Sequence, residues 1–113
     1  MNVTRLEPYD TGHTERSEKD SRPRYMSGTT DAGETSDALI GLTGADPITV
    51  VVSAGTVEWT ISPVSAIQGD AAVWLSWPHG EVATTTSDTA DPGITGLRIT
   101  APAGGACTWE VRG

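Results

Sequence analysis

Hydrophobic residues alternate with polar residues most regularly at the C-terminal end of the chain. Two runs, 97–101 and 107–111, carry a hydrophobic residue at every second position, and a Pro-Ala-Gly-Gly turn separates them. Alternation with a period of two is typical of antiparallel strands that have one face in a core and the other in water. The sequence from Gly93 to Gly113 therefore predicts a pair of strands joined by a turn.

Shorter runs of the same kind fill the chain back to about Leu39. Turn-forming residues separate them at intervals of roughly eight to twelve residues, the spacing of a β-sandwich or barrel. The pattern predicts no helix, and it pairs 48–53 with 56–61 as a hairpin around Ala54-Gly55. The expected fold is an all-β antiparallel sandwich, Ig-like or jelly-roll-like, of seven to eight short strands. Besides the closing pair, strands are predicted over 38–42, 48–53, 56–61, 64–68, 71–77 and 82–87.

Residues 1–38 lack this alternation. Hydrophobic residues are scattered there, charges of both signs are mixed, and Pro8 and Pro23 would interrupt a helix. A segment of this composition cannot bury enough hydrophobic surface to offset the entropy that ordering costs. We therefore predict an extended polar N-terminal arm over 1–38, which becomes ordered on neighbouring subunits, and a sandwich domain over 39–113.

Length and charge exclude several classes of function. A chain of 113 residues holds one small domain. Its formal net charge of −8 and pI of about 4.4 provide no basic surface, so nucleic acids and anionic membranes are not expected partners. No run approaches the roughly 20 apolar residues of a membrane span, and no signal peptide is recognisable. We therefore expect synthesis in a cytoplasm.

No arrangement of residues points to catalysis, so neither an enzyme activity nor a cofactor is predicted. His79 lies in a Pro-His-Gly turn. A catalytic triad of a serine, His79 and Asp70 or Asp88 is not predicted, because the sequence has no nucleophile-elbow motif. Cys107 is the one cysteine and is expected to be a small buried hydrophobic side chain. Asp88 and Asp91 are better explained by turn formation than by metal binding, and no metal site is predicted.

Four tryptophans are many for a small domain and raise a second class of function. Trp59 and Trp109 are in register with hydrophobic faces and are expected in the core, whereas Trp74 is out of register and is expected to be exposed. An exposed tryptophan usually marks an interface. A carbohydrate-binding module of the kind that displays exposed, coplanar tryptophans stays open as an alternative. Glu58 and Glu110 are expected to point to water.

The closing segment resembles the last hairpin of small virion proteins of tailed bacteriophages. The resemblance lies in Ile94-Thr-Gly-Leu-Arg-Ile-Thr-Ala, the glycine turn and Thr108-Trp-Glu-Val-Arg-Gly, and 48–59 and 74–77 are similar to that group as well. It implies a capsid decoration (cement) protein that clamps neighbouring capsid subunits through its arm, or else a tail, connector or fibre-base subunit. It further implies location in the virion, after synthesis in a bacterial host.

Partner contacts are the remaining expectation. The resemblance implies the major capsid protein or other virion proteins as partners, and several copies or a homo-oligomer in the assembly. Mixed charges over 14–24 would form ion pairs at the rim of an interface, where they set register more than affinity. The residues predicted to bind a partner are Leu6, Tyr9, Arg16, Arg22, Arg24, Tyr25 and Trp74.

Overall fold

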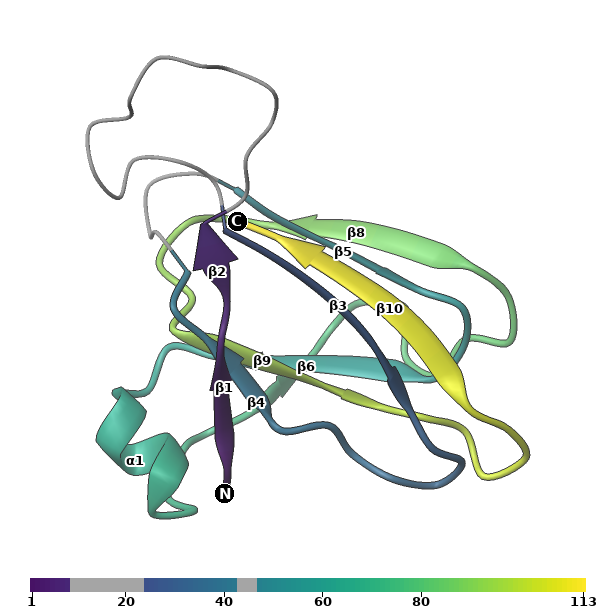
Figure 1. Ribbon diagram of the computed structural model, residues 1–113, viewed down its shortest axis with the longest axis horizontal. Helices are drawn as coiled ribbons and strands as arrows, with labels where there is room; N and C mark the ends of the chain where they lie inside the picture. The colour runs from purple at the N-terminus through teal and green to yellow at the C-terminus, as the bar shows by residue number, and fades with distance from the viewer. Residues whose placement is uncertain (9–23, 43–46) are drawn as a thin grey trace.

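A computed structural model of the chain describes residues 1–8, 24–42 and 47–113. Two five-stranded sheets pack against each other (Figure 1). Sheet A has the strand order β1-β4-β9-β6-β7, and sheet B has the order β2-β3-β10-β5-β8. The predicted all-β sandwich is confirmed, with β1 and β4 as a parallel pair within it. The elements are β1 (Val3–Arg5), β2 (Glu7–Pro8), β3 (Arg24–Thr30), β4 (Ala38–Ile40), β5 (Ile48–Val52), β6 (Thr56–Thr60), α1 (Val64–Gln68), β7 (Leu75–Ser76), β8 (Thr86–Ala90), β9 (Gly96–Thr100) and β10 (Cys107–Arg112).

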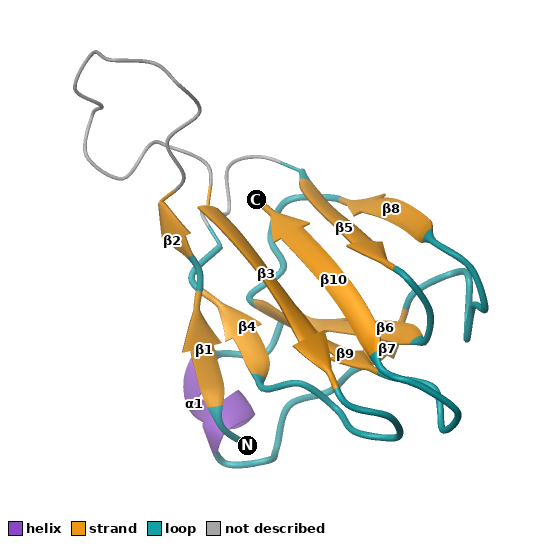
Figure 2. Ribbon diagram, turned by 45° about the vertical axis from the view of Figure 1, so that its right-hand side comes forward, coloured by secondary structure: helices purple, strands orange, loops and turns teal. Residues whose placement is uncertain are grey.

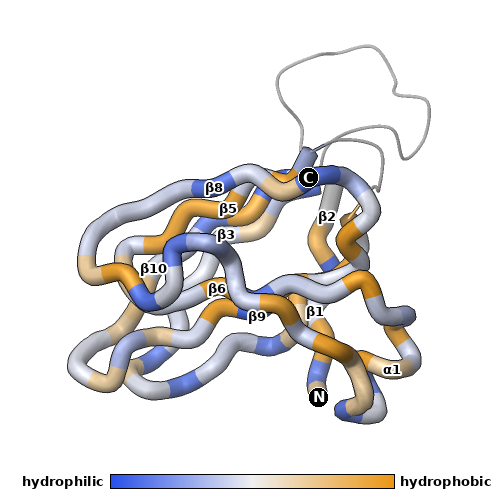
Figure 3. Tube along the Cα trace, turned by 180° about the vertical axis from the view of Figure 1, so that it is seen from behind, coloured by the Kyte–Doolittle hydropathy of each residue, from blue (hydrophilic) through white to orange (hydrophobic). Residues whose placement is uncertain are grey.

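The main hydrophobic core lies between the sheets. Along β10, Cys107, Trp109 and Val111 are buried and the residues between them are exposed, as the alternation predicts. Hydrophobic positions along β5 and β9 supply the two sides of this core (Figure 3). The predicted burial of Cys107 and Trp109 is confirmed. The other buried members are Leu6, Leu39, Ile48, Val50, Val52, Val57, Trp77, Ala90, Ile94, Leu97, Ile99 and Ala101.

In each of the two strand pairs predicted as hairpins, the chain crosses from one sheet to the other, so the two strands do not pair with each other. β9 belongs to sheet A and β10 to sheet B, and β6 and β5 are divided in the same way. β10 pairs with β3 and β5, whereas β9 pairs with β4 and β6. Alternation identifies a half-buried strand but not its neighbour, because the strands on both sides of a crossing turn their hydrophobic faces to the same core.

The N-terminal segment differs from the predicted arm. β1 lies beside β4 in sheet A, and β3 pairs with β10 from Tyr25 to Thr30 in sheet B. Leu6 is fully buried, and its N–H donates to the carbonyl oxygen of Ile40 (2.7 Å). Backbone pairing with β4 and β10, together with the burial of Leu6, places these residues in the sandwich, because strand pairing satisfies main-chain groups whatever the side chain is.

Thr30 and Gly28 show how β3 packs against Trp109 of β10. Thr30 is buried, and its hydroxyl oxygen accepts the indole N–H of Trp109 (3.0 Å), which pairs the polar atom that Trp109 brings into the core. Gly28, opposite Trp109 in the register, has no side chain; a Cβ there would lie 2.6 Å from the indole ring. The remaining residues of the predicted arm, 9–23, lie outside the described residues, and with them Tyr9, Arg16 and Arg22.

Residues 64–68 form the short helix α1 and not the predicted strand. Pro63 precedes the helix and its carbonyl oxygen accepts hydrogen bonds from Ala66 (2.9 Å) and Ile67 (3.1 Å), and Gly69 follows as the C-cap. Proline before and glycine after are helix start and stop signals. The β-branched residues Val64 and Ile67 favoured a strand in the prediction. A helix of one turn is too short to show the helical periodicity that would have indicated otherwise.

The next two predicted strands are also displaced. Of 71–77, only Leu75–Ser76 is strand (β7), and β8 begins four residues later than predicted and ends at Ala90, beyond the predicted end at 87. Trp77 is buried, and its indole N–H donates to the Gly80 carbonyl oxygen (2.6 Å). The turn at Trp77–Gly80 ends the irregular segment.

A second, smaller core covers the outer face of sheet A. Ala38 and Ile40 point outward from β4 and are fully buried by α1, through Ile67. Figure 2 shows α1 next to β1 and β4. Gly96 makes this packing possible, because a Cβ at that position would lie 3.1 Å from Cδ1 of Ile67. Partly buried hydrophobic residues complete the cluster: Met1, Val3, Val64, Ala72 and Trp74.

Candidate functional site

Three large hydrophobic side chains are exposed in the described part of the chain, and all three lie at one edge of sheet A. They are Ile61 (72% exposed), Val73 (69%) and Leu75 (55%), which we call the apolar edge. β7 is the outermost strand of sheet A there, and Leu75 pairs with Trp59 of β6. The N–H of Val73 donates to Oγ of Ser62 (3.1 Å), which brings Val73 next to Ile61.

A groove of about 750 Å³ adjoins the apolar edge. Trp59 and Ile61 form one side, and the segment 89–94, at the end of β8 and the turn after it, forms the other. Trp59, which was expected in the core, packs against it but is only partly buried. Asp91 is the charged residue of the lining. Ile61 belongs to both the apolar edge and the lining of the groove, so the two adjoin at this residue.

Trp74 has a different environment from the one predicted. It is half-buried, and its ring lies 4.2 Å from Cζ of Arg98 in a cation–π contact. Nε of Arg98 donates to Oε1 of Glu58 (2.7 Å), so Glu58 is ion-paired and not simply solvated as expected. The neighbours of Trp74, Val73 and Leu75, are the exposed ones. The prediction that Trp74 is exposed was therefore wrong. It assumed a regular strand over 71–77, but only Leu75–Ser76 is strand.

The outer face of sheet B is the second candidate surface. The register of β3, β10, β5 and β8 places outward-facing residues in three rows of four, which we call the hydroxyl face. Eight of these twelve residues are serine or threonine. The rows are Thr29-Thr108-Ser53-Thr85, Ser27-Glu110-Val51-Ser87 and Tyr25-Arg112-Thr49-Thr89.

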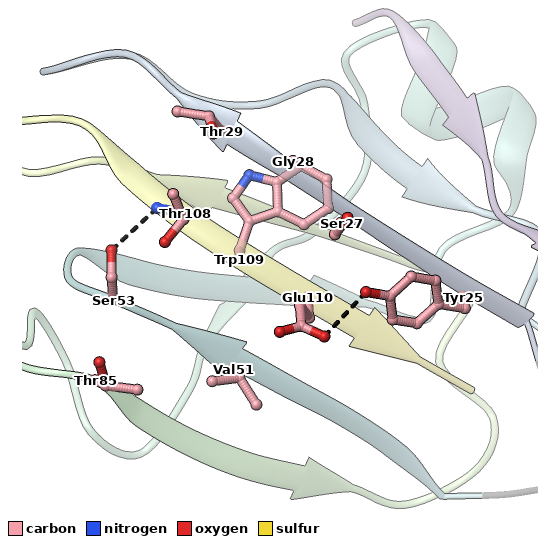
Figure 4. Close-up of a pocket in the computed structure, with 10 residues that line it drawn as sticks. All are labelled: Tyr25, Ser27, Gly28, Thr29, Val51, Ser53, Thr85, Thr108, Trp109 and Glu110. Atoms are coloured by element: carbon pink, nitrogen blue, oxygen red, sulfur yellow. Dashed lines mark hydrogen bonds between the residues drawn. The ribbon is translucent and has the colours of Figure 1, made fainter.

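Figure 4 shows the residues that line a shallow hollow of about 470 Å³: eight members of the hydroxyl face, together with Gly28 and Trp109. The hydroxyl of Tyr25 donates to Oε1 of Glu110 (2.9 Å), and the N–H of Thr108 donates to Oγ of Ser53 (3.0 Å). A second hollow of about 390 Å³ shares Tyr25, Val51 and Glu110 with the first. The two hollows together cover much of the hydroxyl face.

The other predicted partner-binding residues fall in different places. Leu6 belongs to the core. Arg24 is half-buried at the start of β3, where its main chain exchanges hydrogen bonds with Gly113 (2.9 and 2.8 Å). Of the members of the set that the structure describes, Tyr25 alone lies on one of the two candidate surfaces. The residues of the apolar edge were not among the predicted partner-binding residues.

The titratable groups considered for chemistry are also placed. Nε2 of His79 lies 3.4 Å from Oδ2 of Asp88, and the imidazole ring meets the edge of Trp77 with 4.9 Å between ring centroids. Cys107 is buried in the core. Among the described residues, no group of three or more His, Cys, Asp or Glu side chains is arranged to hold a metal ion. None of the helices in that part of the chain has the length and apolar character to span a membrane.

Comparisons of the chain with protein-family models, with curated proteins and with solved structures find no match. The geometry of the two surfaces is therefore what carries a functional proposal.

Proposed function

We propose that this protein is a structural subunit that binds neighbouring protein subunits in a larger assembly. The observation that carries the proposal is the apolar edge: Ile61, Val73 and Leu75 lie together and more than half exposed. Burying one large aliphatic side chain contributes about 1.5–3 kcal/mol. Contiguous exposed hydrophobic surface beside a groove is typical of protein–protein interfaces.

The position of this surface at a sheet edge supports the same conclusion. β7 is the outermost strand of sheet A, so its outer side is where a further strand would pair. A partner segment that adds to β7 would place its hydrophobic side chains on the apolar edge and in the adjoining groove. Main-chain pairing would then supply affinity, and the groove would supply specificity.

The kind of assembly that we propose, a tailed-bacteriophage particle, rests on the sequence resemblance of residues 94–113 alone. Within it we propose a capsid decoration (cement) protein in contact with the major capsid protein, with a tail, connector or fibre-base subunit as the second possibility. The described parts of the predicted arm are strands of the sandwich, so the proposal assigns the contact to the apolar edge. A rigid sandwich at subunit boundaries would reinforce a shell that is under pressure from packaged DNA.

The test is the copy number of the protein in purified particles, measured by quantitative mass spectrometry against the major capsid protein. A ratio near one, or a simple fraction such as a third, supports decoration of the whole shell. About a dozen copies or fewer moves the subunit to the portal or tail. Absence from the particle overturns the proposal.

A pair of variants tests the surface itself. Val73→Arg places a charge in the apolar edge and is expected to abolish incorporation into particles while leaving the fold intact. Val51→Arg places the same side chain on the outer face of sheet B and serves as the matched control. Equal incorporation of both variants would show that the apolar edge is not the contact surface.

A further inference from the structure

We infer that the hydroxyl face of sheet B binds a neutral glycan. This inference does not depend on the proposed assembly function, because it concerns the opposite sheet and a different kind of ligand. It starts from the composition of the face: eight hydroxyl side chains, one phenol, one aliphatic residue and one charge of each sign.

The regular spacing of the face suits a repeating ligand. Adjacent strands lie about 4.8 Å apart, and alternate residues along a strand are separated by about 6.8 Å. Four strands and three rows therefore span roughly 14 Å in each direction. The hollows of about 470 and 390 Å³ lie side by side within this area, each within the range of small-ligand sites. The face is thus larger than one sugar ring and can hold several linked rings.

Its centre combines an apolar floor with oriented polar groups. Val51 is half-buried in the middle row, and Tyr25 lines both hollows together with it. An aromatic ring and an aliphatic side chain provide the surface on which the C–H face of a sugar packs. The Tyr25 hydroxyl holds Glu110 at 2.9 Å across the strand boundary, which orients the carboxylate before a ligand arrives.

The polar groups match the hydroxyl groups of a sugar. Serine and threonine hydroxyls both donate and accept, so a row of them can pair with a ligand that carries donors and acceptors in equal number. Glu110 accepts hydrogen bonds and Arg112 donates them. Both lie on β10, in the middle and last rows of the hydroxyl face. Ordered water can bridge the contacts that side chains do not reach directly.

Charge and polarity separate a glycan from other ligands. Glu110 and Arg112 leave the face without net charge, whereas the whole chain carries −8, which disfavours nucleic acids and sulfated polysaccharides. A protein partner would require a hydrophobic centre, and the face has one aliphatic side chain, Val51. A face that is merely solvated usually carries interspersed charges of both signs, and ten of these twelve residues are uncharged.

The experiment is an NMR titration of the isotope-labelled protein with neutral hexasaccharides. The probes are cellohexaose, maltohexaose, xylohexaose, mannohexaose and chitohexaose, each added to millimolar concentration. At least one is expected to shift backbone amide signals of β3, β5 and β10, and to leave those of α1 and β7 unchanged. If no probe shifts these signals, or if the shifts lie on sheet A, the inference is overturned.

Three variants make the result specific. Val51→Arg fills the hollow and Tyr25→Ala removes the ring, and each is expected to weaken binding of the active hexasaccharide at least tenfold. Tyr25→Phe keeps the ring and loses the bond to Glu110, so an intermediate loss is expected. Val73→Arg, on the apolar edge, is the matched control and should bind as the unmodified protein does. Amide spectra verify that each variant is folded.

The same variants distinguish this inference from the assembly function. Loss of glycan binding in Val51→Arg with normal incorporation into particles supports both proposals. Binding that is equal in Val51→Arg, Tyr25→Ala and the unmodified protein overturns the glycan site and leaves the apolar edge untouched. If Val51→Arg loses incorporation while sugars have no effect on any variant, the face is a protein interface and the inference fails.

Discussion

The outer face of sheet A is covered by the helix α1, whereas the outer face of sheet B is accessible to solvent. On sheet A the outward positions include Ala38, Ile40 and Gly96, and α1 packs over them to form a second core. On sheet B the outward positions are mostly serine and threonine, and the face stays accessible around two hollows. Both sheets turn hydrophobic residues toward the shared core. Because β4 (Ala38–Ile40) is hydrophobic on its outward side as well, α1 covers sheet A, whereas the polar outward residues of sheet B stay accessible.

The largest expected effect comes from truncating the covered face. Ile40→Ala removes a buried side chain of the second core, and the free energy of unfolding is expected to fall by about 2–5 kcal/mol. Val51→Ala, at a corresponding outward position on sheet B, is expected to change it by less than about 1 kcal/mol. Denaturant unfolding of both variants measures the difference. Similar losses would mean that the face of sheet B is packed as tightly as that of sheet A.

Gly96 provides a more local test of how α1 is seated. Gly96→Ala adds a Cβ that would lie 3.1 Å from Cδ1 of Ile67 and 3.3 Å from the carbonyl oxygen of Leu39. Overpacking of this kind should cost about 1–2 kcal/mol, after the smaller gain from restricting the unfolded chain.

A double-mutant cycle identifies the cause of that cost. Ile67→Val removes the crowded methyl group and alone should cost about 0.5–1.5 kcal/mol. Combined with Gly96→Ala it should cost less than the sum, by at least about 0.5 kcal/mol, because the second change relieves the first. Strict additivity in denaturant unfolding would show that Ile67 does not pack on Gly96.

Much of the strand pattern could be predicted from the sequence, because it depends on local alternation. β5, β6, β9 and β10 lie where the alternation is regular, and the burial of Cys107 follows from it. The sheet to which each strand belongs could not be predicted, since hydrogen-bond partners are distant in sequence. β3 is the clearest case: Tyr25 and Met26 are followed by Ser27-Gly28-Thr29-Thr30, without alternation of hydrophobic residues, yet the strand pairs along β10.

The two candidate surfaces show the same limit. The hydroxyl face requires the register of four strands, so no single segment reveals it. Within 71–77, Trp74 was predicted to be exposed, whereas Val73 and Leu75 are the exposed residues. Arg98, which is far along the chain, packs on the ring of Trp74. A long-range contact of this kind has no trace in the local pattern.

Variants of Trp74 test how much its ring contributes to the packing on the outer face of sheet A. Trp74→Ala removes the ring that lies on Arg98, and a loss of about 0.5–2 kcal/mol is expected from the cation–π contact. Trp74→Phe keeps an aromatic face and should recover part of it. Tyr25→Ala, which removes the aromatic ring of the hydroxyl face, is the comparison on sheet B and should cost less. Thermal unfolding of the three variants gives the order, and a neutral Trp74→Ala would show that the ring adds nothing to the cover.

The smallest expected difference is between two threonines on opposite faces. Thr100, on the outer side of sheet A, shares a 2.9 Å hydrogen bond with the hydroxyl of Thr35, whereas Thr29 is exposed on the hydroxyl face. Thr100→Val should cost about 0.5–1.5 kcal/mol, because a paired hydroxyl is lost. Thr29→Val should stay within about 0.5 kcal/mol, since valine fits a strand equally well and no internal bond is broken. If Thr29→Val is neutral in unfolding but weakens glycan binding, the hydroxyls of sheet B serve a ligand and not the fold, whereas a clear loss of stability would assign them to the fold itself.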